Sequence, residues 1–278
     1  MLCYWNGQFV PKEAIAVSPD DRGFLFADGL YEVVRAYEGR FFRMAEHLTR
    51  LTDGASAIRL DRTDFAELEA VGERLLNENG LESGDATFYI QVTRGVAART
   101  HAFPPAGTPP TVFATVKRFT PTPSKQDHGV KAITLPDERW LHCSIKTTAL
   151  TWNVLSNQRA KEAGAEEAVF FRNGHLTEGT HTNVMAVVDG VLVTPPLNNL
   201  ILPGVTRKAV LELAAADGID FAERNLTREE FDDASEIVII GTTMEITPVI
   251  EVEDRLVGIG EPGPVTRRLQ SLFRQLTR

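Results

Sequence analysis

The chain has 278 residues, of which 43% are hydrophobic and 24% are charged, which is the ordinary range for a folded globular protein and excludes a disordered chain. Lys and Arg number 29 against 38 Asp and Glu, and the net charge of −9 argues against a general affinity for nucleic acid or anionic membranes. The 21 Gly and 15 Pro exclude collagen-like and low-complexity chains.

The cysteine content and the apolar runs indicate the compartment. Cys3 and Cys143 are too few for a disulfide framework and suit a reducing environment. No apolar run approaches the roughly 20 residues that a membrane-spanning helix needs. The opening MLCYWNGQFVPKE lacks the basic segment and apolar core of a secretory signal. We therefore expect a soluble cytoplasmic protein.

The first part of the chain alternates hairpins and helices. Two hairpins are predicted, 3–5 with 8–10 around Asn6-Gly7 and 32–37 with 40–43 around Glu38-Gly39. Apolar residues at 44, 48, 51, 55 and 58 form one face of an amphipathic helix. A second helix is predicted at 64–79, followed by strands at 86–96 and 111–117 with a proline-rich loop at 103–110 between them.

The segment FTPTPSKQDHG, which begins at Phe119, contains prolines, a glycine and few apolar residues, and this composition is typical of a linker. We therefore expect a smaller N-terminal domain at 1–118, a linker at 119–123 and a larger domain at 124–278. In the second half, hairpins are predicted at 169–177 and 184–194, and helices at 154–163, 205–216 and 265–276. This mixture predicts an α/β fold of the mixed α+β kind and argues against a doubly wound parallel sheet.

One glycine motif is a false signal. Gly258, Gly260 and Gly263 spell GxGxxG, but a dinucleotide fingerprint needs a strand–helix–strand unit and an acidic residue about 20 positions later. Only 15 residues follow Gly263, so we interpret the motif as a glycine-rich loop.

Three other motifs carry chemistry in combination. CSIKTTAL contains Lys146, HLTEGTHTN contains Glu178, and ILPGVTRKAV places Gly204 and Thr206 at a helix start. Separately they are compatible with a surface lysine, a turn carboxylate and an ordinary helix N-terminus, although such an N-terminus is also a good phosphate site. No CxxC or HxxxH spacing occurs, so no metal site is expected.

In this order and spacing, the motifs resemble those of the fold-type IV pyridoxal-phosphate enzymes, which comprise branched-chain aminotransferases, D-amino acid aminotransferases and aminodeoxychorismate lyases. The resemblance extends over nearly the whole chain, through WNGQFV, DRGFLFADGLYEVVR, HLTRL, GTTMEITPVIEV and GEPGPVTRRL. Arg99 and His101, in YIQVTRGVAARTHAFP, resemble the substrate-carboxylate site of the D-amino acid aminotransferases, which the other two groups generally lack.

The resemblance implies a set of cofactor contacts. Lys146 matches the lysine that forms the Schiff base with pyridoxal 5′-phosphate and that must lose a proton to act as a nucleophile. Glu178 matches the carboxylate that pairs with the pyridine nitrogen, and Arg50 matches the phosphate-binding arginine. The remaining matched cofactor contacts are the backbone N–H groups of Val205 and Thr206, the phosphate-contact loop with Thr242 and Thr243, and Leu202 against the ring.

On the substrate side, Tyr31, Arg99 and His101 match the carboxylate site, and the family's use of a partner-subunit loop here implies a homodimer. Arg99 and His101 lie two apart, so in extended backbone both side chains point to one side. GTHTN departs from the serine-rich GSSSN of the D-amino acid aminotransferases. Thr182 keeps a substrate-side hydroxyl, whereas His181 replaces a small residue and affects substrate breadth.

The resemblance thus predicts ping-pong transamination between D-amino acids and 2-oxo acids, either 2-oxoglutarate or pyruvate. The alternatives are an (R)-selective amine transaminase or mixed enzyme, an aminodeoxychorismate lyase, a branched-chain L-aminotransferase and a non-catalytic cofactor carrier.

Three further residues are interpreted as having no catalytic or binding role. Cys143 is taken as structural, and His47 and Arg43 as groups on a helix surface.

Overall fold

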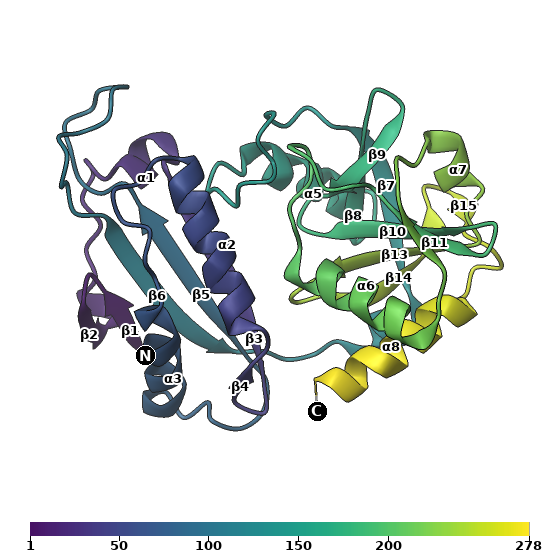
Figure 1. Ribbon diagram of the computed structural model, residues 1–278, viewed down its shortest axis with the longest axis horizontal. Helices are drawn as coiled ribbons and strands as arrows, with labels where there is room; N and C mark the ends of the chain where they lie inside the picture. Colours follow the sequence, from purple (N-terminus) through teal and green to yellow (C-terminus); the bar gives the residue numbers. More distant parts are fainter. Residues whose placement is uncertain (278) are drawn as a thin grey trace. The chain divides into compact units, whose positions relative to one another are not determined.

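The computed structural model describes residues 1–277 and divides the chain into two compact units, each with its own sheet and helices (Figure 1). The first unit is Met1–Pro121 with Ile145–Leu150, and the second is Thr122–Ser144 with Thr151–Arg278. Among the helices that the described residues form, none combines the length and apolar character that a membrane crossing requires.

Within residues 1–277, the first unit holds a six-stranded antiparallel sheet. In spatial order its strands are β2 (Gln8–Pro11), β1 (Leu2–Trp5), β6 (Thr111–Arg118), β5 (Ala86–Thr93), β3 (Gly29–Tyr37) and β4 (Arg40–Phe41). The hairpins β1–β2 and β3–β4 confirm the two predicted from their glycine turns. Asn6 and Gly7 both adopt positive φ, which explains why this turn needs that pair.

Helices α2 (Met44–Ala57) and α3 (Glu67–Glu78) confirm the two predicted amphipathic helices and lie against one face of this sheet (Figure 1). Their inward residues, such as Leu51 and Leu75, share a core with Phe88 and Ile90 of β5. Two short elements, η1 (Lys12–Ala14) and α1 (Arg22–Phe26), connect β2 to β3. Lys12 of η1 and Phe24 of α1 lie over the opposite face of the sheet.

A short segment from the middle of the chain completes the first unit. Strand β4 pairs only with the far end of β3, at Ala36 and Tyr37, which leaves the other end of that edge open. Residues Ile145–Leu150 fill it, because the Tyr31 N–H donates to the Lys146 carbonyl (3.1 Å) and Leu30 bridges Thr147. This segment, which the sequence placed in the second domain, therefore packs as part of the first unit.

The described part of the second unit holds a mixed sheet. Its main path, in spatial order, is β12 (Phe221–Glu223), β11 (Val191–Thr194), β10 (Asn183–Val188), β13 (Glu236–Gly241), β14 (Glu245–Val252), β7 (Val130–Pro136), β8 (Glu167–Arg172) and β9 (His175–Gly179), and β15 (Arg255–Leu256) pairs with β14. Only β11–β12, β14–β7 and β7–β8 are parallel pairs among these strands, so the expected mixed fold is confirmed.

The helices of the second unit largely match the prediction. They are α4 (Pro123–His128), α5 (Thr151–Glu162), α6 (Val205–Asp217), α7 (Arg228–Asp232) and α8 (Pro264–Leu276). Helix α4 lies within the segment that we interpreted as a linker, and Pro123 at its first turn supplies the favourable start that this interpretation overlooked. The GxGxxG segment is a loop that leads into α8, as predicted.

Helix α8 is fixed at its start by a carboxylate from the sheet. Glu236 of β13 is buried and accepts the N–H groups of Val265 (3.0 Å) and Thr266 (2.8 Å) as well as the Thr266 hydroxyl (2.6 Å). Its negative charge also lies at the positive end of the helix dipole. Because Gly263 provides no side-chain cap, Glu236 takes the place of one.

We therefore expect Glu236→Ala to destabilise the protein by about 2 kcal/mol, since it removes these hydrogen bonds and leaves buried N–H groups without a partner. Urea denaturation followed by circular dichroism measures the effect. Glu261→Ala, at an exposed position before the same helix, is the matched control. Equal unfolding midpoints for the two variants would contradict the capping role.

Candidate active site

Lys146 lies against Tyr31 in the first unit. The backbone pairing of Ile145–Leu150 with β3 brings the Lys146 Nζ to 4.2 Å from the centre of the Tyr31 ring. Thr148 secures the segment from the other side, because its N–H donates to the Gly29 carbonyl (3.0 Å) and its hydroxyl donates to the Ala27 carbonyl (3.0 Å). Backbone hydrogen bonds, rather than its own side chain, thus determine where Lys146 stands.

Arg50 is held next to this pair by a buried carboxylate. Glu32 of β3 is fully buried and accepts Arg50 Nε (2.7 Å) and Nη2 (2.8 Å), while His47 Nδ1 lies 2.8 Å from its second oxygen. A carboxylate can only accept, so this ring nitrogen carries the hydrogen. We call Tyr31, Glu32, His47, Arg50 and Lys146 the lysine cluster.

The charges of the lysine cluster are strongly coupled. Burial by itself raises the pKa of Glu32, but Arg50 and His47 outweigh it and bring that pKa to about 2. Burial outweighs the Glu32 hydrogen bond at His47 and lowers the pKa of the ring, and the positive charges of Arg50 and Lys146 act in the same direction. At neutral pH, Glu32 is therefore an anion beside a neutral imidazole.

Arg99 and His101 share a contact with Phe26. Both are exposed and both pack on Phe26, with the Arg99 guanidinium 5.1 Å and the His101 ring 5.5 Å from its ring centre. Buried Arg22 supports this loop by donating to the Thr100 carbonyl (2.7 Å). Within residues 1–277, no hydrogen bond, ion pair or ring contact joins Arg99 or His101 to Tyr31 or Lys146.

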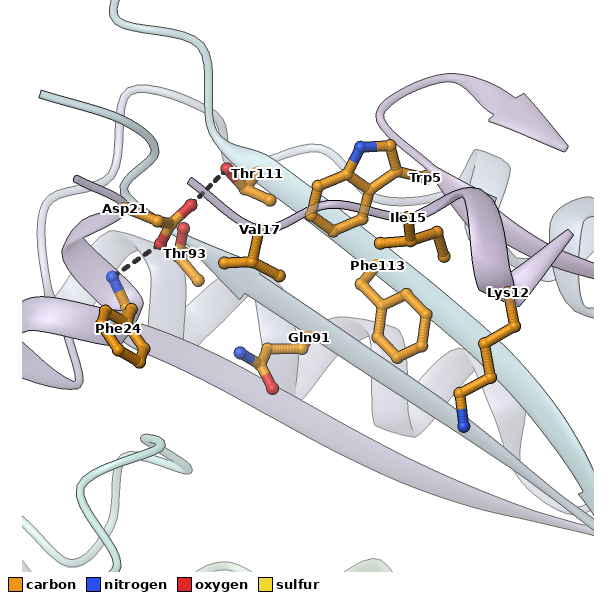
Figure 2. Close-up of a pocket in the computed structure, with 11 residues that line it drawn as sticks. Trp5, Lys12, Ile15, Val17, Asp21, Phe24, Gln91, Thr93, Thr111 and Phe113 are labelled. Carbon is orange, nitrogen blue, oxygen red and sulfur yellow. Dashed lines mark hydrogen bonds between the residues drawn. The ribbon is translucent and has the colours of Figure 1, made fainter. Parts of the chain in front are cut away.

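A separate hollow of about 470 Å³ opens on the sheet face opposite α2 and α3. Figure 2 shows Trp5, Ile15 and Phe113 side by side along it, and Asp21 accepting a hydrogen bond from the Thr111 hydroxyl (2.6 Å) at one end. Its rim includes the exposed side chains of Val17 and Phe24. None of the residues that the motifs predicted for a site lines it.

In the second unit, Glu178 ends up in a buried network centred on Arg139. The Arg139 guanidinium binds both oxygens of Asp137 (2.9 and 2.8 Å) and donates through Nη1 to Glu178 Oε1. All three side chains are at most 7% exposed. The second Glu178 oxygen accepts the Leu202 N–H (3.0 Å) and the Asn183 amide (3.2 Å).

This network sets the charge of Glu178. Burial raises the pKa of Glu178, and the ion pair with Arg139 and the hydrogen bond from Leu202 oppose that rise. The net result is a pKa above the ordinary value of a glutamate. We call Asp137, Arg139, Glu178, Asn183 and Leu202 the glutamate cluster.

The start of α6 adjoins the glutamate cluster. Its N-cap, Gly204, has no side-chain cap, and a Cβ on Gly204 would collide with Asn183 Oδ1, so the backbone approaches this side chain closely. Val205 and Thr206 are buried at this N-terminus. A buried helix N-terminus without a side-chain cap is suited to an anion such as phosphate. Thr242 and Thr243 lie in the partly exposed turn between β13 and β14.

Thr182 has a different environment from the one expected. Its side chain is buried, and its hydroxyl donates to Glu167 Oε2 (2.8 Å). Glu167 is fully buried at the start of β8 and also approaches the exposed ring of His181, with Nδ1 3.2 Å from Oε2. The Thr182 hydroxyl hydrogen is therefore used inside the protein.

Sequence reasoning missed several of these residues. His47, which we expected on a helix surface, is 2% exposed, because β3 places Glu32 directly beneath that helix position. Arg139 and Glu167 were not predicted, since an isolated charge in a sequence does not reveal its long-range partner. Cys143 is buried, and burial raises the pKa of its thiol to about 11, in keeping with the structural role that we expected.

The lysine cluster predicts how the stability of the protein changes with pH. Glu32 has a pKa below its unfolded value, so it stabilises the fold above about pH 4.5 and loses this effect as the pH falls toward 2. We expect Glu32→Gln to cost about 3 kcal/mol at pH 7 and less with each step of acidification below pH 4.5. Urea unfolding from pH 7 to pH 3 measures this, with exposed Glu69→Gln as the control. If the difference in free energy of unfolding between the variant and the wild type did not change with pH, ionised Glu32 would not be the stabilising group.

Comparison with known proteins connects these clusters to a family. The model of the family described as amino-transferase class IV matches residues 29–252. The chain is 40% identical to a D-alanine aminotransferase of Staphylococcus haemolyticus over 96% of this chain and 95% of that protein, and 39% identical to one of Bacillus licheniformis over 98% and 95%. Its fold matches a branched-chain amino acid aminotransferase of Escherichia coli with a TM-score of 0.92 at 29% identity, covering 99% of this chain and 94% of the other.

The family match spans most of the chain, and the relatives span nearly all of it. These findings confirm the resemblance that the motifs indicated. The chain belongs to the class IV aminotransferases, which are pyridoxal-phosphate enzymes.

Proposed function

We propose that this protein is a pyridoxal-phosphate-dependent D-amino acid aminotransferase that moves the amino group between D-amino acids and 2-oxo acids, with 2-oxoglutarate or pyruvate as acceptor. The observation that carries this proposal is the identity of about 40% to D-alanine aminotransferases over nearly the full length of both chains. The pair Arg99 and His101 supports it, because two cationic or donor groups converging on one anion suit an amino acid carboxylate.

The second unit supplies groups that fit the cofactor. Glu178 is a buried carboxylate that we propose for the pyridine nitrogen, and Leu202 for the ring face. The uncapped N-terminus of α6, with the N–H groups of Val205 and Thr206, suits the phosphate. Arg50, Thr242 and Thr243 are the other proposed phosphate contacts. When bound, pyridoxal phosphate supplies an electron sink for the bonds at the substrate α-carbon.

The protein residues then perform binding and proton transfer. We propose that Lys146 attaches the cofactor covalently and that its Nζ acts as base and acid. It takes the proton from the α-carbon of the amino donor, and in the second half-reaction it delivers a proton to the α-carbon of the amino acid formed from the 2-oxo acid. Tyr31, Arg99 and His101 are proposed to hold the substrate carboxylate. Thr182, the fourth proposed substrate-side residue, acts through the loop that it stabilises, because its hydroxyl donates to Glu167.

A branched-chain aminotransferase is the second candidate, favoured by the fold match to the Escherichia coli enzyme. Absorbance of the holoenzyme before and after addition of D-alanine, D-glutamate, L-leucine or (R)-1-phenylethylamine distinguishes the candidates. We expect the D-amino acids to convert the yellow form. Preferential conversion by L-leucine would favour the branched-chain activity, and conversion by the amine alone would favour an amine transaminase.

Replacement of the lysine tests its role directly. We expect Lys146→Ala to lower the turnover of D-alanine with 2-oxoglutarate by at least about a thousandfold, because both the covalent attachment and the acid–base group are lost. Lys131→Ala, at an exposed lysine of β7, is the control. Multiple turnovers by Lys146→Ala at near the wild-type rate would show that the assignment is wrong.

We also propose a cytoplasmic homodimer in which Arg99 and His101 act in the partner's site. Within residues 1–277, neither residue makes a hydrogen bond, ion pair or ring contact with Tyr31 or Lys146, and this supports the arrangement. The exposed Phe24 and Val17 at the rim of the hollow offer apolar surface for a second copy. The free cysteines Cys3 and Cys143 suit a reducing compartment.

Co-expression of Lys146→Ala with Arg99→Ala tests the exchange between subunits. Each variant alone is expected to be impaired, whereas mixed dimers contain one complete site, so random pairing restores about a quarter of the wild-type activity. A mass of one chain in sedimentation equilibrium, or no gain over the separate variants, would exclude the shared site. Co-expression of Lys146→Ala with Lys131→Ala is the control, because the Lys131→Ala chain keeps every proposed site residue.

A further inference from the structure

Glu167 organises the loop that follows Glu178. Its Oε1 accepts the N–H groups of Thr180 (3.0 Å) and Ala168 (2.9 Å) together with the Thr180 hydroxyl, and its Oε2 accepts the Thr182 hydroxyl. The carboxylate is fully buried, so these donors replace water around it. A buried anion with this many donors fixes the backbone that supplies them.

The same loop is held from a second side by α5. The Asn153 amide donates to the Thr180 carbonyl (2.7 Å), and the Asn157 amide donates to the Thr180 hydroxyl oxygen (3.2 Å). Gly179 has no space for a side chain, because a Cβ there would lie 2.8 Å from Glu167 Oε2. The loop 179–182 is therefore fixed by internal hydrogen bonds and is not a solvated turn, and we call it the platform.

His181 is the one exposed residue of this platform. Its Nδ1 lies 3.2 Å from Glu167 Oε2 and 3.0 Å from the Thr180 hydroxyl oxygen, and 44% of the side chain is accessible. Since the carboxylate can only accept, Nδ1 carries a hydrogen and the ring is oriented by it. Within residues 1–277, Nε2 has no hydrogen-bond partner, and Glu167 is the only charged hydrogen-bond or ion-pair partner of the ring.

The position of His181 places it beside the residues proposed for the cofactor. It follows Glu178 by three residues, and the backbone next to it borders the β13–β14 turn, since a Cβ on Gly241 would lie 3.5 Å from the His181 carbonyl oxygen. That turn carries Thr242 and Thr243. The exposed ring of His181 is therefore available to a polar group of a ligand bound beside Glu178 and this turn.

We propose that His181, positioned by Glu167, is a specificity-determining residue that binds the distal carboxylate of a dicarboxylic substrate such as D-glutamate or 2-oxoglutarate. The inference rests on the proposed function and deepens it by naming the substrate class. With Glu167 behind Nδ1 and a ligand carboxylate at Nε2, two anions flank the ring, and an imidazolium satisfies both with its two N–H donors. A substrate with an aliphatic side chain gains no binding energy from His181.

The first test measures binding without chemistry. Calorimetric titration of the holoenzyme compares glutarate, which has two carboxylates, with butyrate, which has one, and neither can transaminate. We expect His181→Ser to weaken glutarate binding about tenfold and to leave butyrate binding within about twofold. Glu167→Gln, which keeps the shape but removes the countercharge, should reduce the preference for glutarate in the same direction.

Steady-state kinetics provides a second readout. Binding of the distal carboxylate stabilises ground state and transition state alike, so His181→Ser should raise KM for D-glutamate about tenfold, leave its kcat nearly unchanged and spare D-alanine. The control is His175→Gln, which removes a half-buried histidine from the preceding hairpin. Its values for both substrates should equal those of the wild type.

The outcomes separate this inference from the proposed function. Unchanged glutarate affinity in His181→Ser overturns the role of His181, and so does an equal loss of glutarate and butyrate affinity, which would indicate only a collapsed loop. If the wild-type holoenzyme transaminates no D-amino acid but still prefers glutarate through His181, the proposed function fails and the dicarboxylate site stands.

Discussion

The second unit is organised around one buried cation. The Arg139 guanidinium binds Asp137 at the end of β7 and Glu178 in β9, and it donates to the Leu200 carbonyl (3.1 Å) in the loop before α6. Removal of one member of such a buried network leaves an uncompensated charge, which costs several kcal/mol. The position of Glu178, and with it the usefulness of the neighbouring helix N-terminus, therefore depends on Arg139.

The first unit also contains a buried ion pair, with the roles of cation and anion reversed. There a buried anion, Glu32, holds a cation, Arg50, whereas in the second unit a buried cation holds an anion, Glu178. In both cases a buried partner of opposite charge holds the group that is proposed to contact the cofactor. Such pairs contribute little net stability compared with apolar side chains, but they fix orientation, and orientation is what a cofactor site requires.

Local patterns predicted the elements well and the charge partners poorly. The turn at Asn6-Gly7 and the stripe ending at Ile58 are short-range signals, so the β1–β2 hairpin and α2 were predictable. The motifs around Lys146 and Glu178 identified the family. Arg139 lies 39 positions before its partner Glu178, and nothing in the local sequence relates the two. The pairing of Ile145–Leu150 with β3 was invisible for the same reason, since it depends on an edge that a short β4 leaves open.

That pairing has a consequence for the order in which the chain assembles during synthesis. The first 121 residues contain the sheet strands and helices of the first unit, yet the contact between Leu30 and Thr147 spans more than a hundred positions. The nascent sheet must therefore wait, with part of the β3 edge unpaired, until the segment with the lysine has left the ribosome. The residue proposed for catalysis is thus among the last to join its own unit, and the polypeptide must leave that unit once and return to it to deliver this residue.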